Sequence, residues 1–174
     1  MYKTALREKM EYQLGQLKKD VNPGLLYNSL ETLISLVQQD AALAENFIDR
    51  LAALYRYTLE HRHKELVSLE EEVNAMQDLV YLYHQKYQGG IRINSCTAGE
   101  ETGFLLIPGS LPDIVENIIL STIIQPGRLL EIDIFVENNF VVLHYRSNDR
   151  LIFQHPIQET IHRLSQTYRF LQIR

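Results

Sequence analysis

The stretch that decides the fold lies near the N-terminus and reads Asn22-Pro23-Gly24-Leu25-Leu26-Tyr27-Asn28-Ser29-Leu30. Asparagine is a favoured cap before a helix, and proline fits the first helical position because the N–H that it lacks would have no partner there. Apolar residues then recur every three or four positions, which is typical of one face of a helix. The sequence predicts a helix that begins afresh at this Asn-Pro pair, or a longer helix that kinks there, since residues 1–20 are also rich in helix formers.

A second helix is expected after the short polar break Gln38-Gln39-Asp40, where Asp40 is a suitable cap. Two helices joined so closely pack antiparallel. A lone hairpin of this size buries only part of its apolar surface, and a second copy of the chain is the simplest partner, giving a four-helix bundle. We therefore expect a homodimer whose interface consists of Leu26, Leu30, Leu33, Val37, Phe47, Leu51 and Leu54.

The remainder of the chain contains patterns of both helices and strands, and these predict an α+β domain. Ser68 and Glu71 have the spacing of a capping box, so a third helix is expected to run to about Tyr87. A second capped helix is expected to open at Ser110 and to end at Gln125-Pro126-Gly127. The other expected elements are a strand at 91–97, a β-hairpin of strands 130–136 and 140–145, and a final helix at 158–170.

Composition excludes several classes of protein. The chain has 174 residues, of which 45% are hydrophobic, and its net charge of −5 offers no strong attraction to nucleic acid, so no nucleic-acid partner is expected. A single cysteine, Cys96, excludes an internal disulfide and a cysteine-based zinc site. His61 and His63 flank Arg62 with a spacing that is only a weak metal signal, so no metal is expected. No apolar run is long enough to cross a bilayer, and the chain as given is expected to be cytoplasmic.

The Asn-Pro stretch resembles the phosphoacceptor motif of the LytS/YehU-type sensor histidine kinases, Asn-Pro-His-Phe-Leu-Phe-Asn-Ser-Leu, with six of nine positions identical. Further matches follow in the family's order, and together they cover roughly residues 17–168. They are Arg56-Tyr57, Leu69-Glu70-Glu71-Glu72, Lys86-Tyr87 in place of Arg-Phe, Val115-Glu116-Asn117, and Arg163-Leu164 followed by Tyr168. The resemblance implies a phosphoacceptor-like dimerisation hairpin at 1–66, a reduced GHKL-like ATPase domain (an α/β sandwich) at 67–174, and ATP with Mg²⁺ as the family's cofactors.

The departures from the family pattern concern the chemistry. Gly24 occupies the position of the phosphorylated histidine, and glycine has no nucleophile. The family's Asp-x-Gly box aligns with residues 146–150, where Asp149 is the one acid and no glycine follows. The Gly-x-Gly-Leu lid aligns with residues 154–157, where Pro156 removes a backbone donor. Of the residues that form the nucleotide site in the family, only Asn117 is retained at its aligned position, which helps to coordinate Mg²⁺ in the family.

Three hypotheses follow from this combination. The leading one is a catalytically inactive member, binding no cofactor, that acts as a dimeric scaffold or as a subunit beside an active kinase or a response regulator. The alternative is an enzyme that binds ATP weakly through Asn117 and Asp149 and phosphorylates a histidine on a partner. In the third, the resemblance is only architectural and the chain is an unrelated helical interaction domain. A structure without a helix–strand–strand–helix layout after residue 90 would favour this third hypothesis. Family members usually carry an N-terminal membrane sensor, so the resemblance also implies upstream helices that anchor the natural protein in the inner membrane.

Overall fold

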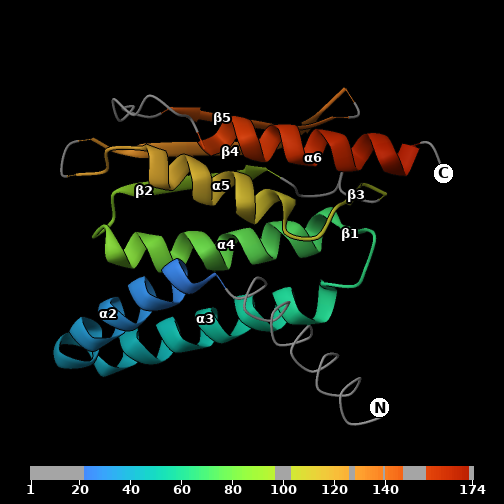
Figure 1. Cartoon of the computed structure of the whole chain (residues 1–174). Helices are drawn as coiled ribbons and strands as arrows, with labels where there is room; N and C mark the ends of the chain where they lie inside the picture. The colour runs from blue at the N-terminus through green and yellow to red at the C-terminus, as the bar shows by residue number, and fades with distance from the viewer. Residues whose placement is uncertain (1–21, 97–102, 126–127, 139, 147–155, 173–174) are drawn as a thin grey trace, which may run out of the picture.

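The computed structural model describes residues 22–96, 103–125, 128–138, 140–146 and 156–172. Figure 1 shows a helical hairpin at the bottom, one long helix across the middle, and two further helices in front of a small sheet. The helices are α2 (Pro23–Gln39), α3 (Ala41–His61), α4 (Leu69–Lys86), α5 (Ser110–Ser121) and α6 (Pro156–Gln172). This is the α+β class with an N-terminal helical part that the sequence predicted.

Both helices of the hairpin begin at the expected caps. Asn22 has an extended backbone, and its Oδ1 accepts the N–H of Leu25 at 3.2 Å, so α2 begins afresh at Pro23. Asp40 accepts the N–H groups of Ala42 and Leu43 at 2.9 and 3.1 Å at the start of α3. These bonds satisfy N–H groups that have no partner within the helix.

Helix α4 is the element on which the rest packs. A reciprocal capping box starts it: Ser68 Oγ accepts the N–H of Glu71 at 3.2 Å, and the Glu71 carboxylate accepts the N–H of Ser68 at 2.8 Å. Nine of its residues are buried, from Leu69 to Tyr83, and it contacts the hairpin, α5 and the sheet. The boundary expected between residues 66 and 67 falls just before this helix, and one apolar core continues across it.

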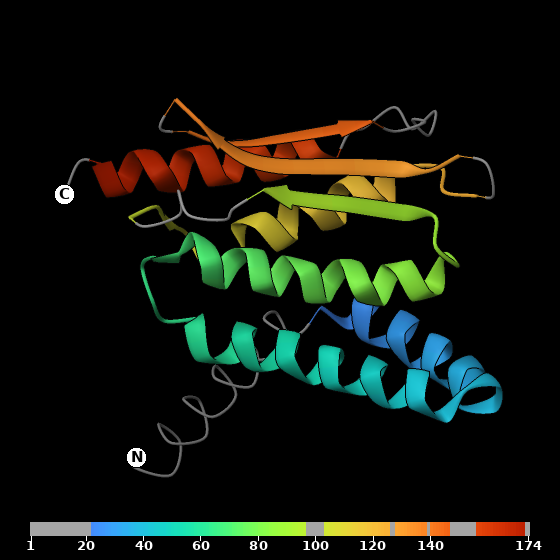
Figure 2. The same ribbon diagram turned by 180° about the vertical axis from the view of Figure 1, so that it is seen from behind.

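The sheet consists of β2 (Ile91–Cys96), β4 (Leu130–Glu137) and β5 (Phe140–Arg146), in the order β2-β4-β5. Strand β2 runs parallel to β4, and β5 pairs antiparallel with β4. Parallel neighbours need a long crossover connection, which here includes α5. Alternate residues of β4 are buried, and the view from behind shows no described helix on the opposite face of the sheet (Figure 2).

Two features of the second half differ from the expectation. The cap of α5 is Gly109, whose φ is +81°, and not Ser110. The helix ends at Ser121 rather than at Gln125, and Thr122 is buried in an extended conformation. A short antiparallel ladder between β1 (Val67–Ser68) and β3 (Leu105–Leu106) was not predicted, because two residues are too few to produce a periodic pattern.

The order α5–β4–β5–α6 is the helix–strand–strand–helix layout after residue 90. The absence of this layout would have favoured the hypothesis of an unrelated helical domain, so the structure gives that hypothesis no support.

The capping box of α4 gives a first testable prediction. Ser68→Ala removes the acceptor for the N–H of Glu71, and we expect the free energy of unfolding to fall by about 1 kcal/mol in urea titrations. Ser35→Ala on the exposed part of α2 is the matched control and should change it by less than about 0.5 kcal/mol. Equal effects of the two substitutions would show that the box does not stabilise the fold.

Candidate functional site

The carboxyl group of Glu72 is completely buried and joins three helices. One oxygen accepts the hydroxyl of Tyr57 on α3 and the N–H of Gly109 at 2.6 Å. The other accepts the Ser110 hydroxyl at 3.1 Å and the N–H of Leu111 at 2.8 Å. Burial raises the pKa of the Glu72 carboxyl, and the four donors oppose that shift. Glu72 therefore supplies the acceptors for the first turn of α5 that Ser110 was expected to supply.

A second carboxyl group, that of Glu116, joins α5 to the start of the hairpin. Asn22 donates its side-chain N–H₂ group to both oxygens, at 3.0 and 2.9 Å, and the Tyr83 hydroxyl donates at 2.7 Å. Burial, and then the nearby charge of Asp113, raise the pKa of Glu116. These bonds give Glu116 a structural role. The sequence did not predict that the Asn-Pro stretch and the Val-Glu-Asn stretch touch.

Three contacts tie α6 to α5 and to the chain before it. The Asn117 amide donates to the carbonyl of Asp113 at 2.8 Å and to the Thr160 hydroxyl at 3.0 Å. Arg163 pairs with the Asp113 carboxylate at 2.7 Å. The Tyr168 hydroxyl accepts a backbone N–H from the segment before α5, at 2.9 Å. The Asn117 side chain is therefore oriented by α6.

Gly24 lies exposed in the first turn of α2. A Cβ atom at this position would meet the cap oxygen Oδ1 of Asn22 at 3.3 Å and no other described atom within 4 Å, so a side chain requires that oxygen to shift by a few tenths of an ångström. The position of the family's phosphoacceptor is open to solvent and holds no nucleophile.

The described residues include only part of the region where the family binds ATP and Mg²⁺. Asn117, which aligns with the position that helps to coordinate Mg²⁺ in the family, donates its side-chain N–H₂ group to Thr160 of α6. Asp149 and residues 147–155, where the family's Asp-x-Gly box and most of the lid align, lie outside the described residues. Pro156 begins α6 in place of a lid residue. Within the described part of the chain, no group of three or more His, Cys, Asp and Glu side chains is placed to hold a metal ion.

The residues expected at a dimer interface do not share one face of the hairpin. Phe47 and Leu54 are buried in the core of the single chain, Leu33 and Leu51 pack against that core, Leu26 is half-buried, and Leu30 and Val37 are exposed. Of the seven, Leu30 and Val37 are therefore the most accessible to a second copy in this conformation.

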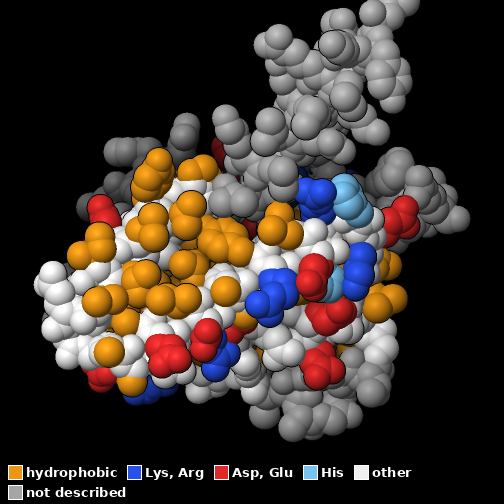
Figure 3. Space-filling model, turned by 90° about the horizontal axis from the view of Figure 1, so that it is seen from below, with side chains coloured by type: hydrophobic (Ala, Val, Ile, Leu, Met, Phe, Trp, Pro, Cys, Tyr) orange, Lys and Arg blue, Asp and Glu red, His pale blue; other side chains and the backbone are white. Residues whose placement is uncertain are grey.

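The exposed apolar stripe of α2 is rotated relative to the expected one. It consists of Tyr27, Leu30, Ile34 and Val37, with Ile48 of α3 also exposed, and their exposed fractions lie between 44% and 70%. Figure 3 shows apolar side chains gathered over one end of the outer face of the hairpin, while charged side chains gather toward the other end. We call these five residues the outer hairpin stripe.

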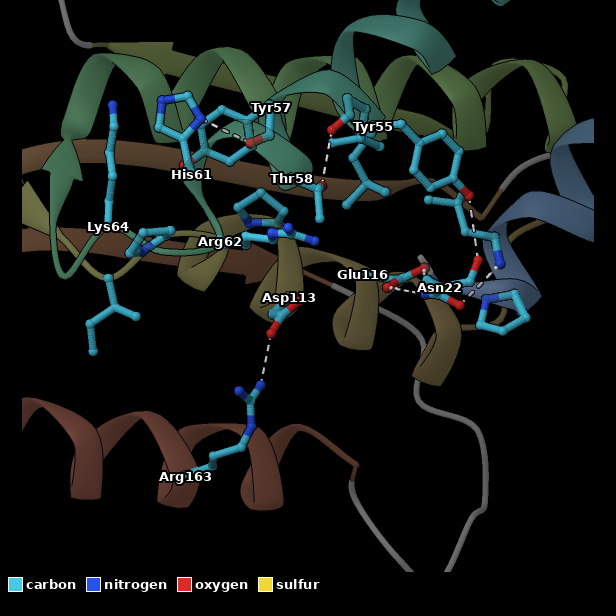
Figure 4. A pocket seen from close by; sticks show the side chains of 18 residues that line it. Asn22, Tyr55, Tyr57, Thr58, His61, Arg62, Lys64, Asp113, Glu116 and Arg163 are labelled. Carbon is cyan, nitrogen blue, oxygen red and sulfur yellow. Dashed lines mark hydrogen bonds and ion pairs between the residues drawn. The ribbon is translucent and has the colours of Figure 1, made fainter. Parts of the chain in front are cut away.

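A pocket of about 620 Å³ lies between the end of α3, the start of α5 and α6. Figure 4 shows Asn22 and Glu116 at one side of it, His61, Arg62 and Lys64 at the other, and Arg163 reaching in from α6. Sequence reasoning did not find this pocket, because its walls come from segments far apart in the chain.

Comparisons with known proteins show that the sequence of this chain is similar to sensor histidine kinases. The family model described as "Histidine kinase" matches residues 12–91, which include the hairpin and α4. The sensor protein LytS of Bacillus cereus is 22% identical over 137 residues, which are 79% of this chain and 23% of that protein. The sensor histidine kinase BtsS of Escherichia coli is 27% identical over 120 residues, 67% of this chain and 21% of that protein. The sensor histidine kinase/phosphatase LytS of Staphylococcus aureus is 23% identical over 124 residues, 71% of this chain and 21% of that protein.

Within that class, the chain is similar to the LytS-type sensor histidine kinases, the family that the sequence motifs resemble, at 22–27% identity. It spans less than a quarter of the length of these relatives. Among the described residues, no helix has the length and apolar character that a membrane span requires.

The Glu72 cluster gives a second prediction. In Glu72→Gln, an N–H₂ group would face one of the two backbone N–H groups of the α5 terminus, so we expect the free energy of unfolding to fall by about 2–3 kcal/mol. Glu70→Gln, an exposed change in the same helical turn, is the control. Chemical denaturation of both proteins measures the difference, and similar stabilities would contradict the role given to Glu72.

A third prediction follows from the raised pKa of Glu116. A carboxyl group with a higher pKa in the folded chain than its ordinary 4.5 makes stability fall as pH rises above 4.5, because the folded state holds a proton that the unfolded state has released. The fall ends once folded Glu116 is ionised. Glu116→Gln should lack this component, so its stability curve between pH 4 and about pH 8 should be flatter than that of the wild type. Parallel curves would contradict the assignment.

Proposed function

We propose that this chain is a dimeric signalling scaffold of the sensor kinase family that does not transfer phosphate. The observation that carries the proposal is Gly24, an exposed glycine without a nucleophile at the position that aligns with the family's phosphoacceptor. The amide of Asn117, bonded to Thr160, supports it, because a residue fixed against α6 is poorly placed to serve a nucleotide. The alternative, weak ATP binding through Asn117 and Asp149 with phosphorylation of a partner, has no comparable support among the described residues.

The scaffold would work as a pair of chains joined through the outer hairpin stripe. Five exposed apolar side chains are more than a solvated hairpin requires, and the four on α2 have the spacing of a helix face that packs against another helix. The pair would present the hairpin to an active kinase or to a response regulator. We place it in the cytoplasm, where upstream helices of the natural protein would connect it to the membrane.

Restoring the missing histidine tests the loss of catalysis. Gly24→His replaces a poor helix former but brings a Cβ atom 3.3 Å from the cap oxygen of Asn22, so circular dichroism first checks that the variant folds. When each purified protein is incubated with radiolabelled ATP and Mg²⁺, neither should carry phosphate. Label on the introduced histidine of the Gly24→His chain would show that a working nucleotide site remains, and label on the wild type would overturn the proposal outright.

The dimer is tested by placing a charge in the outer hairpin stripe. Ile34→Glu would bury a carboxylate on both copies, so we expect the dimer dissociation constant to rise about 100-fold or more in sedimentation equilibrium. Ile161→Glu is the matched control, an exposed isoleucine on α6 with an exposed fraction of 51% against 65% for Ile34. A wild type that sediments as a monomer, or equal effects of both substitutions, would contradict this interface.

A further inference from the structure

Strand β5 lies at an edge of the sheet, and its outer edge has no partner among the described residues. It pairs with β4 in one continuous antiparallel register, and no other described strand lies beside it. The backbone N–H and C=O groups of a strand alternate between its two neighbours, so about half of those in β5 point away from β4. A row of unpaired donors and acceptors is a template on which another strand can add.

This edge lacks the features that keep edge strands of other proteins apart, which are prolines, bulges, lysines, inward charges or a very short strand. Residues 140–146 read Phe-Val-Val-Leu-His-Tyr-Arg, with no proline, glycine, lysine or acid. The seven residue pairs with β4 contain no bulge. Phe140 and Tyr145 have exposed fractions of 70% and 45%. The strand is therefore suited to pairing with another strand.

Alternate side chains of β5 lie on the outer face of the sheet, the face that no described helix covers (Figure 2). The ring of His144 packs edge-on against that of Phe135, with 5.2 Å between the ring centroids. Arg146 lies 3.5 Å from a carboxylate oxygen of Glu131, and its side chain remains 87% exposed. The outer-face residues of β5 are Phe140, Val142, His144 and Arg146.

The sequence of β5 is complementary to itself when two copies run antiparallel about Leu143. Directly opposite residues in an antiparallel pair point to the same face, so this register continues the inner and outer faces of the sheet. The pairs across the two copies are Phe140 with Arg146, Val141 with Tyr145, and Val142 with His144. Aromatic side chains stabilise such pairs when they face a β-branched residue or a cation. All seven residues are paired in this register, and no two like charges face each other.

We propose that β5 pairs antiparallel with β5 of a second copy, so that the two sheets become one continuous sheet. The self-complementary register is the reason for choosing a second copy as the occupant of this edge. Figure 1 shows β5 at the end of the molecule opposite to the hairpin of α2 and α3. One copy can therefore use both contacts at the same time, and dimers joined through the hairpin would link through β5 into longer chains.

The two contacts differ in strength. One pair of short strands is a small interface beside the about 1,200–2,000 Å² of total surface that stable complexes bury, so we expect the β5 contact to form at higher protein concentration than the hairpin contact. The proposed scaffold would then be a dimer when dilute and a chain of dimers where it is concentrated. The chain of dimers rests on the hairpin interface proposed above, whereas the β5 contact does not.

Sedimentation velocity of the full chain over a series of concentrations separates the two contacts. The wild type should grow beyond a dimer as its concentration rises. Ile34→Glu should stop at a dimer joined through β5, and Phe140→Arg should stop at a dimer joined through the hairpin. The variant with both substitutions should stay monomeric at concentrations at which Ile34→Glu is dimeric.

Phe140→Arg acts through its charge, because it places an arginine opposite Arg146 of the second copy, and the two-fold symmetry repeats this pair. In the Ile34→Glu chain, we expect it to raise the dissociation constant of the β5 contact about tenfold. Phe140→Glu removes the same exposed ring but introduces the opposite charge, so this matched control should keep the dissociation constant within about threefold. Residue 140 pairs with Glu137 of β4 in its own chain, so the arginine suits the fold better than the glutamate does. Weaker association of the arginine variant therefore cannot come from a damaged sheet.

Two results would overturn the proposal. One is an Ile34→Glu chain that remains monomeric at every concentration, which is also the result expected if this edge binds a strand of another protein. The other is equal weakening of association by Phe140→Arg and Phe140→Glu. Failure of the hairpin interface gives a different pattern that still supports the β5 contact: the wild type and Ile34→Glu would both stop at a dimer, and Phe140→Arg would be mainly monomeric.

Hydrogen exchange of the Ile34→Glu chain tests the location of the contact. Backbone amides of β5 that point away from β4 have no partner in the single chain, so they should exchange more slowly as the protein concentration rises. The same amides should show little concentration dependence when Phe140→Arg is added. Protection confined to other elements would contradict pairing at this edge.

Discussion

A carboxyl group withdrawn from water must be given hydrogen-bond donors by the protein, and Glu72 obtains its donors from two other helices of the fold. Tyr57 contributes a hydroxyl from α3, and the first turn of α5 contributes two backbone N–H groups and the Ser110 hydroxyl. Since α4 carries the carboxyl group, this cluster fixes α5 relative to the hairpin. The bond between Asn22 and Glu116, and the pocket beside it, depend on that placement.

Several residues that this chain shares with the sensor kinases join one element of the structure to another. Tyr57, Glu72, Glu116, Arg163 and Tyr168 all make contacts between elements, and all are present. Gly24 is a departure from the family's motif, at the position to which the resemblance assigns the phosphoacceptor. A fold can retain its internal contacts while its chemistry is lost, because packing and catalysis act on different side chains.

The sequence predicted the elements well wherever a local signal exists. The caps at Asn22 and Asp40 and the box at Ser68 are read from neighbouring residues, and each is present. The sequence did not predict features that depend on contacts between segments far apart in the chain. Ser110 looked like a cap, but Glu72 of another helix supplies the acceptors. Phe47 and Leu54 share a helical stripe with residues that reach solvent, yet α4 packs on the hairpin and buries them, which the spacing alone could not show.

The central claim is that the architecture of a sensor kinase persists here without its nucleotide site. Isothermal titration calorimetry of the full chain with Mg-ATP at millimolar concentration tests this most directly. The account predicts no heat of binding, and the same result for Asn117→Ala. Saturable binding by the wild type that Asn117→Ala abolishes would contradict the account, because it would show that Asn117 still serves a nucleotide.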